Sequence, residues 1–167
     1  MTVAYSNETQ ATLNDDSFAD LTFDDVRAQG IKELSNKAFG KAAQTIKYFL
    51  CFDSCAIKNS PPNYDVWKSL NTLINLQSLR VILNVTEIPS FAFEGKKLKE
   101  ISLTSKQNLA IKSGAFENME KAIEIEIYGT SFKTNYKFNN KLFIYFTNSK
   151  MTGDSFEEGA FDGAQGP

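Results

Sequence analysis

The sequence predicts an α/β solenoid, with a short parallel sheet on its concave face and loops and short helices on its convex face. The first observation is that six large aromatic residues recur at intervals of 28, 26, 23, 22 and 23 residues. The second is that four of them follow an alanine, and the third is that strand-like apolar runs lie between them. A period in the twenties indicates stacked repeats. The six aromatic residues are Phe39, Trp67, Phe93, Phe116, Phe138 and Phe161.

The apolar runs fit the strand half of a leucine-rich repeat, Leu-x-x-Leu-x-Leu-x-x-Asn, whose apolar positions face inward. Residues 76–84 fit best, with Leu76, Leu79 and Val81 inward and Asn84 at the turn. We predict about six leucine-rich repeats over residues 18–164, and we expect the array to continue beyond this chain. The inward residues of the other runs are Phe18, Leu21 and Phe23; Ile46, Phe49 and Cys51; Leu98, Ile101 and Leu103; Ala122, Ile125 and Ile127; and Ile144 and Phe146.

The segments outside these strands follow from composition and spacing. Residues 59–63 contain two prolines and two asparagines and predict a loop. Residues 66–76 carry apolar side chains at helical spacing and predict a helix on the convex face. Residues 1–17 are polar and predict an N-terminal tail, and residues 165–167 form the C-terminal end. The aromatic residue of each repeat should fill the core between neighbouring coils, where burying a phenylalanine contributes roughly 1.5–3 kcal/mol.

The composition argues against several function classes. The 167 residues include 18 basic and 20 acidic side chains, and a net charge of −2 gives no reason to expect nucleic acid or an anionic membrane as partner. No apolar run approaches the ~20 residues of a membrane span. Histidine, the commonest general base and metal ligand, does not occur. Nucleophile elbows and phosphate-binding glycine loops are also missing. We expect a non-enzymatic protein that uses no metal or cofactor.

The two cysteines, Cys51 and Cys55, are four positions apart, which is not the spacing of a redox pair or of a metal site. They form a disulfide if the compartment is oxidising, or they remain two buried thiols. The start of the chain lacks the pattern of a signal peptide. The protein is therefore either cytosolic or secreted with its leader missing from this chain.

Two glycosylation sequons occur, at Asn7-Glu8-Thr9 and at Asn84-Val85-Thr86. Asn7 lies in the polar tail, where a sugar could attach, and it is the glycosylation candidate. Asn84 occupies the turn position of its repeat, so we expect its side chain to face inward and to remain unmodified.

A concave binding face follows from the predicted register, because side chains alternate along a strand. In the first repeat it would carry Asp20, Thr22 and Asp24, and over the whole array its only basic residue would be Arg80. Tyrosine and arginine among apolar side chains are typical of interface hot spots. The alternative is that residues such as Leu50, Phe52 and Phe143 pack under a loop or that a strand is wrongly phased. The candidate protein-binding residues are Tyr48, Arg80, Glu100, Glu124, Glu126, Tyr128, Phe143 and Tyr145.

The run Asp154-Ser-Phe-Glu-Glu-Gly-Ala-Phe-Asp-Gly163 resembles extracellular leucine-rich-repeat proteins of arthropods, the type similar to the non-catalytic subunit of oplophorus-luciferin 2-monooxygenase. Weaker copies are Ser113-Gly-Ala-Phe-Glu-Asn118 and Ala92-Phe-Glu-Gly95. The resemblance implies a secreted, non-enzymatic protein that binds other proteins. The segment Ile88-Pro-Ser-Phe-Ala-Phe93 also suits the Ile-x-x-x-Ala-Phe surface repeats of microbes. A second functional possibility is an accessory subunit that stabilises an assembly through the open ends of the array.

Overall fold

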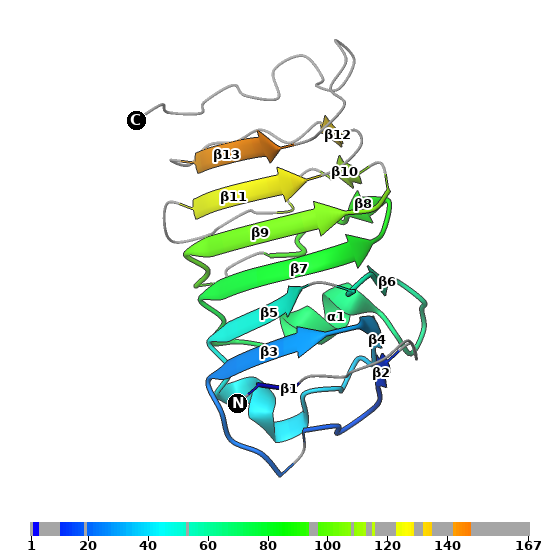
Figure 1. Cartoon of the computed structure of the whole chain (residues 1–167), viewed down its shortest axis with the longest axis vertical. Helices are drawn as coiled ribbons and strands as arrows, with labels where there is room; N and C mark the ends of the chain where they lie inside the picture. The colour runs from blue at the N-terminus through cyan, green and yellow to red at the C-terminus, as the bar shows by residue number, and fades with distance from the viewer. Residues whose placement is uncertain are drawn as a thin grey trace.

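The computed structural model describes residues 2–3, 11–18, 20–52, 54–93, 97–107, 109–112, 115, 123–128, 132–134 and 142–147 (Figure 1). In residues 2–3, 123–128, 132–134 and 142–147 this description covers the backbone alone. The fold is dominated by parallel β-sheet and has few helices in its described part. Successive strands lie one above the other along the longest axis of the molecule (Figure 1).

The main sheet is built from strands that lie side by side in chain order. Its path is β1-β3-β5-β7-β9-β11-β13, and the short strand β6 also pairs with β7. Every pairing is parallel, so the chain crosses back after each long strand, in agreement with the predicted parallel sheet. The strands are β1 (Thr2–Val3), β3 (Asp25–Gln29), β5 (Tyr48–Phe52), β6 (Ile57–Lys58), β7 (Ser78–Asn84), β9 (Glu100–Ser105), β11 (Ile123–Tyr128) and β13 (Leu142–Thr147).

Shorter strands lie beside the carboxyl ends of the long ones (Figure 1). Strand β2 (Ala11–Leu13) pairs with β4 (Ile31–Leu34), and β8 (Glu87–Ile88), β10 (Leu109–Ile111) and β12 (Phe132–Thr134) form a three-stranded parallel sheet. The corner between β3 and β4 is made by Gly30 at φ 74°, a left-handed conformation that glycine adopts without steric cost. These strands have two to four residues, too few for a recognisable alternation of apolar and polar positions.

The return segments include a 3-10 helix, η1 (Gly40–Gln44), and an α-helix, α1 (Val66–Asn71). Helix α1 begins at Asp65, whose Oδ1 accepts hydrogen bonds from the backbone N–H groups of Trp67 (3.0 Å) and Lys68 (3.2 Å). The helix was predicted over residues 66–76 but ends at Asn71, and Ile74 is 51% exposed. The physical reason is that the chain must turn back between residues 72 and 77 to enter β7.

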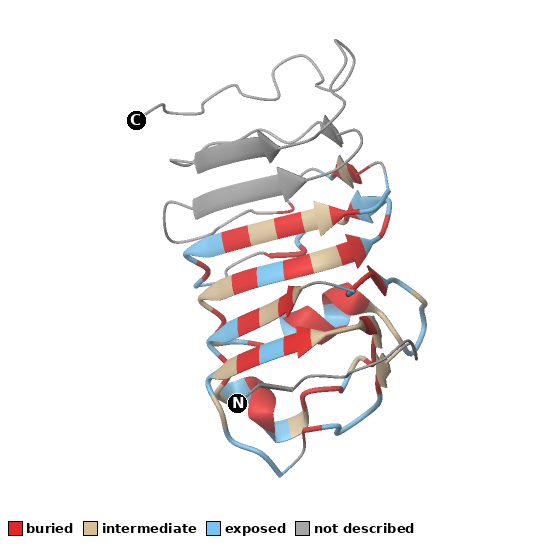
Figure 2. Cartoon of the chain, viewed as in Figure 1, coloured by how far each residue is buried: buried red, intermediate tan, exposed pale blue. Residues whose placement is uncertain are grey.

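The core lies on one face of the main sheet, where burial alternates along each strand (Figure 2). In β7, Leu79, Val81 and Leu83 are buried, whereas Ser78, Arg80 and Ile82 lie on the opposite face and are more exposed. Strands β5 and β9 alternate in the same phase, so their predicted inward residues are confirmed: Phe49, Cys51, Ile101 and Leu103.

The large aromatic residues of the return segments fill the core behind the main sheet, as far as the structure describes them. Phe39, Trp67 and Phe93 are buried. The Phe39 ring packs edge-on against Phe49 with centroids 5.3 Å apart, and it stacks on Phe18 at 5.9 Å. The corresponding predictions for Phe116, Phe138 and Phe161 lie outside the described residues.

The predicted first strand was wrong in its register, although two of its three inward residues do contact the core: Phe18 is buried, and Phe23 packs against the core. We expected Leu21 and Phe23 to face inward and Asp20, Thr22 and Asp24 to face outward, with a turn at Val26. Instead, β3 begins at Asp25, its buried residues are Val26 and Ala28, and Leu21 is 39% exposed. Pairing with β5 determines which residues of β3 face the core, because Val26 and Ala28 lie opposite Phe49 and Cys51. A small alanine there leaves room for the larger neighbouring side chains.

Residues 1–17, which we predicted to be a polar tail, contain two strands. Thr2–Val3 pairs with β3, and Ala11–Leu13 pairs with β4. Leu13 is buried, so this segment contributes to the core. These pairings depend on residues far along the chain and have no local sequence signal.

Candidate binding face of the main sheet

The face of the main sheet opposite the core carries the candidate residues. We call it the open face and define it by the strand residues that alternate with the buried ones in β3, β5, β7 and β9. Strand register arranges these residues in three rows across the sheet. The first row is Asp25, Tyr48, Ser78 and Glu100; the second is Arg27, Leu50, Arg80 and Ser102; the third contains Gln29, Phe52, Ile82 and Thr104.

A hollow of about 310 Å³ lies on the open face between the first two rows. It brings together two predicted site residues, Arg80 and Glu100, which come from neighbouring strands. The Ser78 hydroxyl donates a hydrogen bond to Oε2 of Glu100 at 3.3 Å, which orients the carboxylate along the edge of the hollow. Its lining consists of Leu50, Ser78, Leu79, Arg80, Glu100, Ile101 and Ser102.

Tyr48 stands next to this hollow in the first row, as the register partner of Ser78. It is 40% exposed, so part of its side chain is accessible to solvent. Tyrosine combines a large apolar ring with a hydroxyl that can donate or accept a hydrogen bond. An aromatic side chain, a guanidinium and a carboxylate therefore border one area of the sheet.

The charge of the open face differs from our expectation. Because β3 begins at Asp25, the face also carries Arg27, which sequence reasoning missed. Arg27 is paired with Asp25 through Nη2 and Oδ2 at 3.1 Å, and its Nε donates a hydrogen bond to the same carboxylate. Strands β3 to β9 thus present two arginines and two carboxylates, whereas the mixed acidic and aromatic face that we expected over the whole array had Arg80 as its only basic residue. The sequence signal that could have located β3 was the pair of apolar residues at alternate positions, Val26 and Ala28.

The remaining predicted site residues lie on β11 and β13, where the backbone alone is described. Register places Glu124 opposite Glu100 and Phe143, and Glu126 opposite Ser102 and Tyr145. Tyr128 lies opposite Thr104. These residues extend the three rows, while their side-chain contacts lie outside the described part of the chain.

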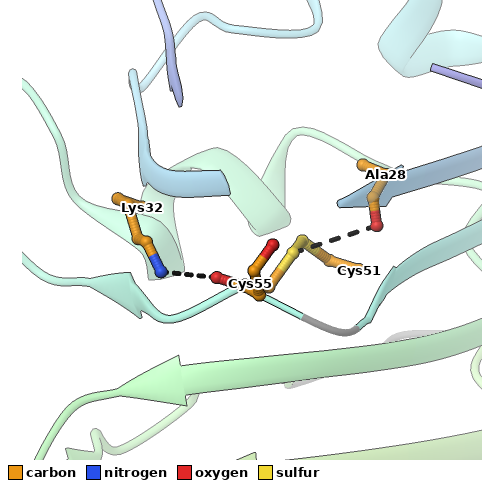
Figure 3. The surroundings of a disulfide bond; sticks show 5 residues. Ala28, Lys32, Cys51 and Cys55 are labelled. Atoms are coloured by element: carbon orange, nitrogen blue, oxygen red, sulfur yellow. Dashed lines mark hydrogen bonds between the residues drawn. A yellow bond between two sulfur atoms is a disulfide. The ribbon is translucent and has the colours of Figure 1, made fainter. Parts of the chain in front are cut away.

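Cys51 and Cys55 are joined by a disulfide, and both residues are fully buried (Figure 3). Cys51 lies on the core face of β5, and Cys55 follows the strand, with 6.1 Å between the two Cα atoms. Sγ of Cys55 lies 3.9 Å from the carbonyl oxygen of Ala28 on β3. Because a disulfide sulfur has no proton to donate, this is a packing contact. The Lys32 ammonium donates a hydrogen bond to the carbonyl of Ser54 in the same turn.

A cluster of polar side chains, away from the open face, links the short strands β2, β4 and β6. The Lys58 ammonium contacts Oε1 of Glu33 at 3.1 Å, and the Thr12 hydroxyl donates a hydrogen bond to Oε2 of the same carboxylate at 3.2 Å. The hydrogen bond from Lys58 lowers the pKa of Glu33 below its ordinary value, against the opposing effect of burial. Glu33 thereby links β2, β4 and β6, so its role is structural.

Of the asparagines in the two sequons, the structure describes Asn84 only. Asn7 lies outside the described residues. Asn84 does not face inward as expected; it is exposed at the end of β7. The strand alternation continues two residues further than the repeat template assumes, so Leu83 and Val85 are buried and Asn84 lies on the opposite side.

No helix in the described part of the chain is long and apolar enough to cross a membrane. Among the described residues, no group of three or more His, Cys, Asp or Glu side chains is arranged to hold a metal ion. No family model matches this chain, and comparisons with curated proteins and with solved structures found no match either.

Proposed function

We propose that residues 18–164 form a leucine-rich-repeat array that acts as a non-enzymatic binding module and presents the open face of its sheet to a protein partner. The parallel sheet with one long strand per repeat supports the repeat assignment. The buried positions of β5, β7 and β9, which match the apolar positions of the leucine-rich template, support it too. On this interpretation the open face is the concave face of the array.

The observation that carries the proposal is the hollow lined by Arg80 and Glu100, with the exposed Tyr48 in the neighbouring register position beside Ser78. Aromatic and arginine side chains contribute most to binding energy where a partner excludes water from them. The half-buried Leu50 provides an apolar floor beside the two charged groups. The area therefore combines apolar contact with directional polar contacts.

The chemistry of the face indicates what kind of partner would fit. Arg80 suits a carboxylate, and Glu100 suits an ammonium or guanidinium group, because complementary charges favour correct docking. A partner segment that presents one acidic and one basic side chain around an apolar one would match all three. We therefore favour an amphipathic protein segment.

We further propose that the protein is extracellular. A disulfide between Cys51 and Cys55 persists in oxidising compartments and is rare in the reducing cytosol. The resemblance of residues 154–163 to secreted arthropod proteins points the same way.

The test is binding of the full chain to an array of secreted proteins from its source organism, followed by titration calorimetry with each partner found. We expect Arg80→Ala and Glu100→Ala each to weaken binding at least tenfold, equivalent to about 1.4 kcal/mol. Lys41→Ala is the matched control, because Lys41 is exposed on η1, away from the open face. This control should bind within twofold of the unaltered chain.

Two results would count against the proposal. Equal affinity of all three variants would remove the open face as the binding surface. Concentration-dependent self-association that persists in the Arg80→Ala and Glu100→Ala variants would favour the accessory-subunit alternative instead.

A further inference from the structure

The second sequon combines three features that the sequence pattern did not predict. Asn84 ends β7, is exposed, and is followed by the buried Val85 and the exposed Thr86. The backbone carbonyl of Thr86 accepts a hydrogen bond from the N–H of Ala110 at 2.9 Å, and the Thr86 side chain is accessible. Both side chains that define a glycosylation sequon are thus on the surface of the folded protein.

The amide oxygen of Asn84 accepts a hydrogen bond that holds its side chain in place. Its Oδ1 accepts a hydrogen bond from Nε2 of Gln107 at 2.9 Å. A glycan attaches to the other side-chain atom, Nδ2, and leaves the amide oxygen in place. Attachment at Nδ2 is therefore compatible with the hydrogen bond from Gln107.

A hollow of about 250 Å³ opens beside Asn84. One water molecule takes up about 30 Å³ in the liquid, so the hollow has room for a much larger group. Exposed side chains at its edge, among them Asn59, Thr86 and Glu87, carry hydrogen-bonding oxygens, which suit the hydroxyl groups of a sugar ring. The lining residues are Asn59, Asp65, Trp67, Asn84, Val85, Thr86, Glu87 and Pro89.

We propose that Asn84 carries an N-linked glycan whose first sugar lies at this hollow. The donor is an oligosaccharide linked to a lipid pyrophosphate, and the reaction is a substitution at the anomeric carbon of its first sugar. A bond forms between that carbon and Nδ2 of Asn84, the bond to the pyrophosphate oxygen breaks, and Nδ2 loses one proton. The lipid pyrophosphate is the leaving group, and no oxidant or reductant takes part.

The position of Asn84 has a consequence for the proposed binding face. Asn84 lies four residues beyond Arg80 on the same strand, which corresponds to about 13 Å at 3.3 Å per residue. The glycan would therefore border the carboxyl-end rim of the open face. The proposal rests on the extracellular location proposed above, but it does not depend on any partner being bound.

The test uses the full chain secreted from eukaryotic cells behind a cleavable leader, with Asn7→Gln introduced so that Asn84 is the only remaining sequon. Intact mass and sensitivity to peptide N-glycosidase measure occupancy. We expect one glycan on this protein and on its Thr86→Ser derivative, which keeps the sequon. We expect none on the Asn84→Gln and Thr86→Ala derivatives.

A second assay keeps the result independent of folding. Cell-free translation with endoplasmic reticulum microsomes reports glycan transfer even for a variant that is not secreted. Recovery of the Asn84 peptide without glycan from the Asn7→Gln protein in both assays would overturn the proposal. Occupied Asn84 together with unchanged partner binding in the Arg80→Ala variant would overturn the proposed binding face alone.

Discussion

Trp67 of α1 packs edge-on against Phe93, with ring centroids 5.9 Å apart and an interplanar angle of 89°. The two residues lie on the return segments before β7 and before β9, and both are buried. Edge-to-face pairs of this kind contribute about 0.5–1.5 kcal/mol beyond the burial of their surface. The contact shows how one return segment closes the core of the next.

Removing this contact should destabilise the protein strongly. We expect Phe93→Ala to lower the free energy of unfolding by about 3–5 kcal/mol, because it leaves a cavity in a close-packed core. Phe91→Ala is the matched control, since Phe91 lies two residues away and is 52% exposed. Its effect should stay within about 0.5 kcal/mol. Urea unfolding measures both, and equal losses would contradict the buried contact between Phe93 and Trp67.

The disulfide should stabilise the protein moderately, because it closes a short loop in the unfolded chain. We expect the double variant Cys51→Ala/Cys55→Ala to lose about 2 kcal/mol. For a chain of this length the melting temperature should fall by about 4–8 °C, as measured by calorimetry. Thiol titration of the unfolded, never-reduced protein should find no free thiol. Two titratable thiols would rule the bridge out.

The Glu33–Lys58 pair should make stability depend on pH. The pKa of Glu33 is lowered in the folded protein, so the pair contributes stability above the pKa of the unfolded carboxyl, about 4.3. This contribution disappears as the pH falls through the lower pKa of the folded state. We expect Glu33→Gln to cost about 0.2–1 kcal/mol at pH 7 and nothing near pH 2, by urea unfolding.

A matched control for this pair is Glu87→Gln, which removes the contact between Glu87 and Lys112 at 3.4 Å. Both side chains of that pair are about half exposed, whereas Glu33 is only 21% exposed. The control should therefore have the smaller effect. A loss that is the same for Glu33→Gln at pH 7 and pH 2 would show that packing, and not charge, is responsible.

The start of α1 depends on Asp65. Asp65→Ala should cost about 0.5–2 kcal/mol, because the N–H groups of Trp67 and Lys68 lose their acceptor. Asp65→Asn should retain most of the stability, since asparagine also caps helices well. Thermal unfolding separates the two variants. If asparagine were as harmful as alanine, the capping hydrogen bonds would not be the cause.

The buried positions of the strands could be predicted where apolar and polar residues alternate clearly. The inward residues of β5, β7 and β9 follow from alternation of apolar and polar side chains, and leucine, isoleucine, valine or phenylalanine occupies most of these positions. The pattern failed at β3, where Leu21 and Phe23 fit the template as well as Val26 and Ala28 do. Parallel pairing with Phe49 and Cys51, more than twenty positions away, selected the second pair.

The candidate face was predicted only in part for the same reason. Arg80 and Glu100 were identified because their strands were correctly phased. Arg27 was missed because a shift of β3 exchanges the residues that face the core for those that face away. Asn84 was misplaced because β7 continues to its position before the chain turns.

The sequence by itself determined the parallel strand order and the buried residues of the central strands, because apolar periodicity is a local property of the chain. The tertiary structure alone decided where β3 begins, that Arg27 lies beside Asp25, and that Asn84 reaches the surface. These features depend on hydrogen-bonded register between strands more than twenty residues apart, and local spacing carries no information about that register.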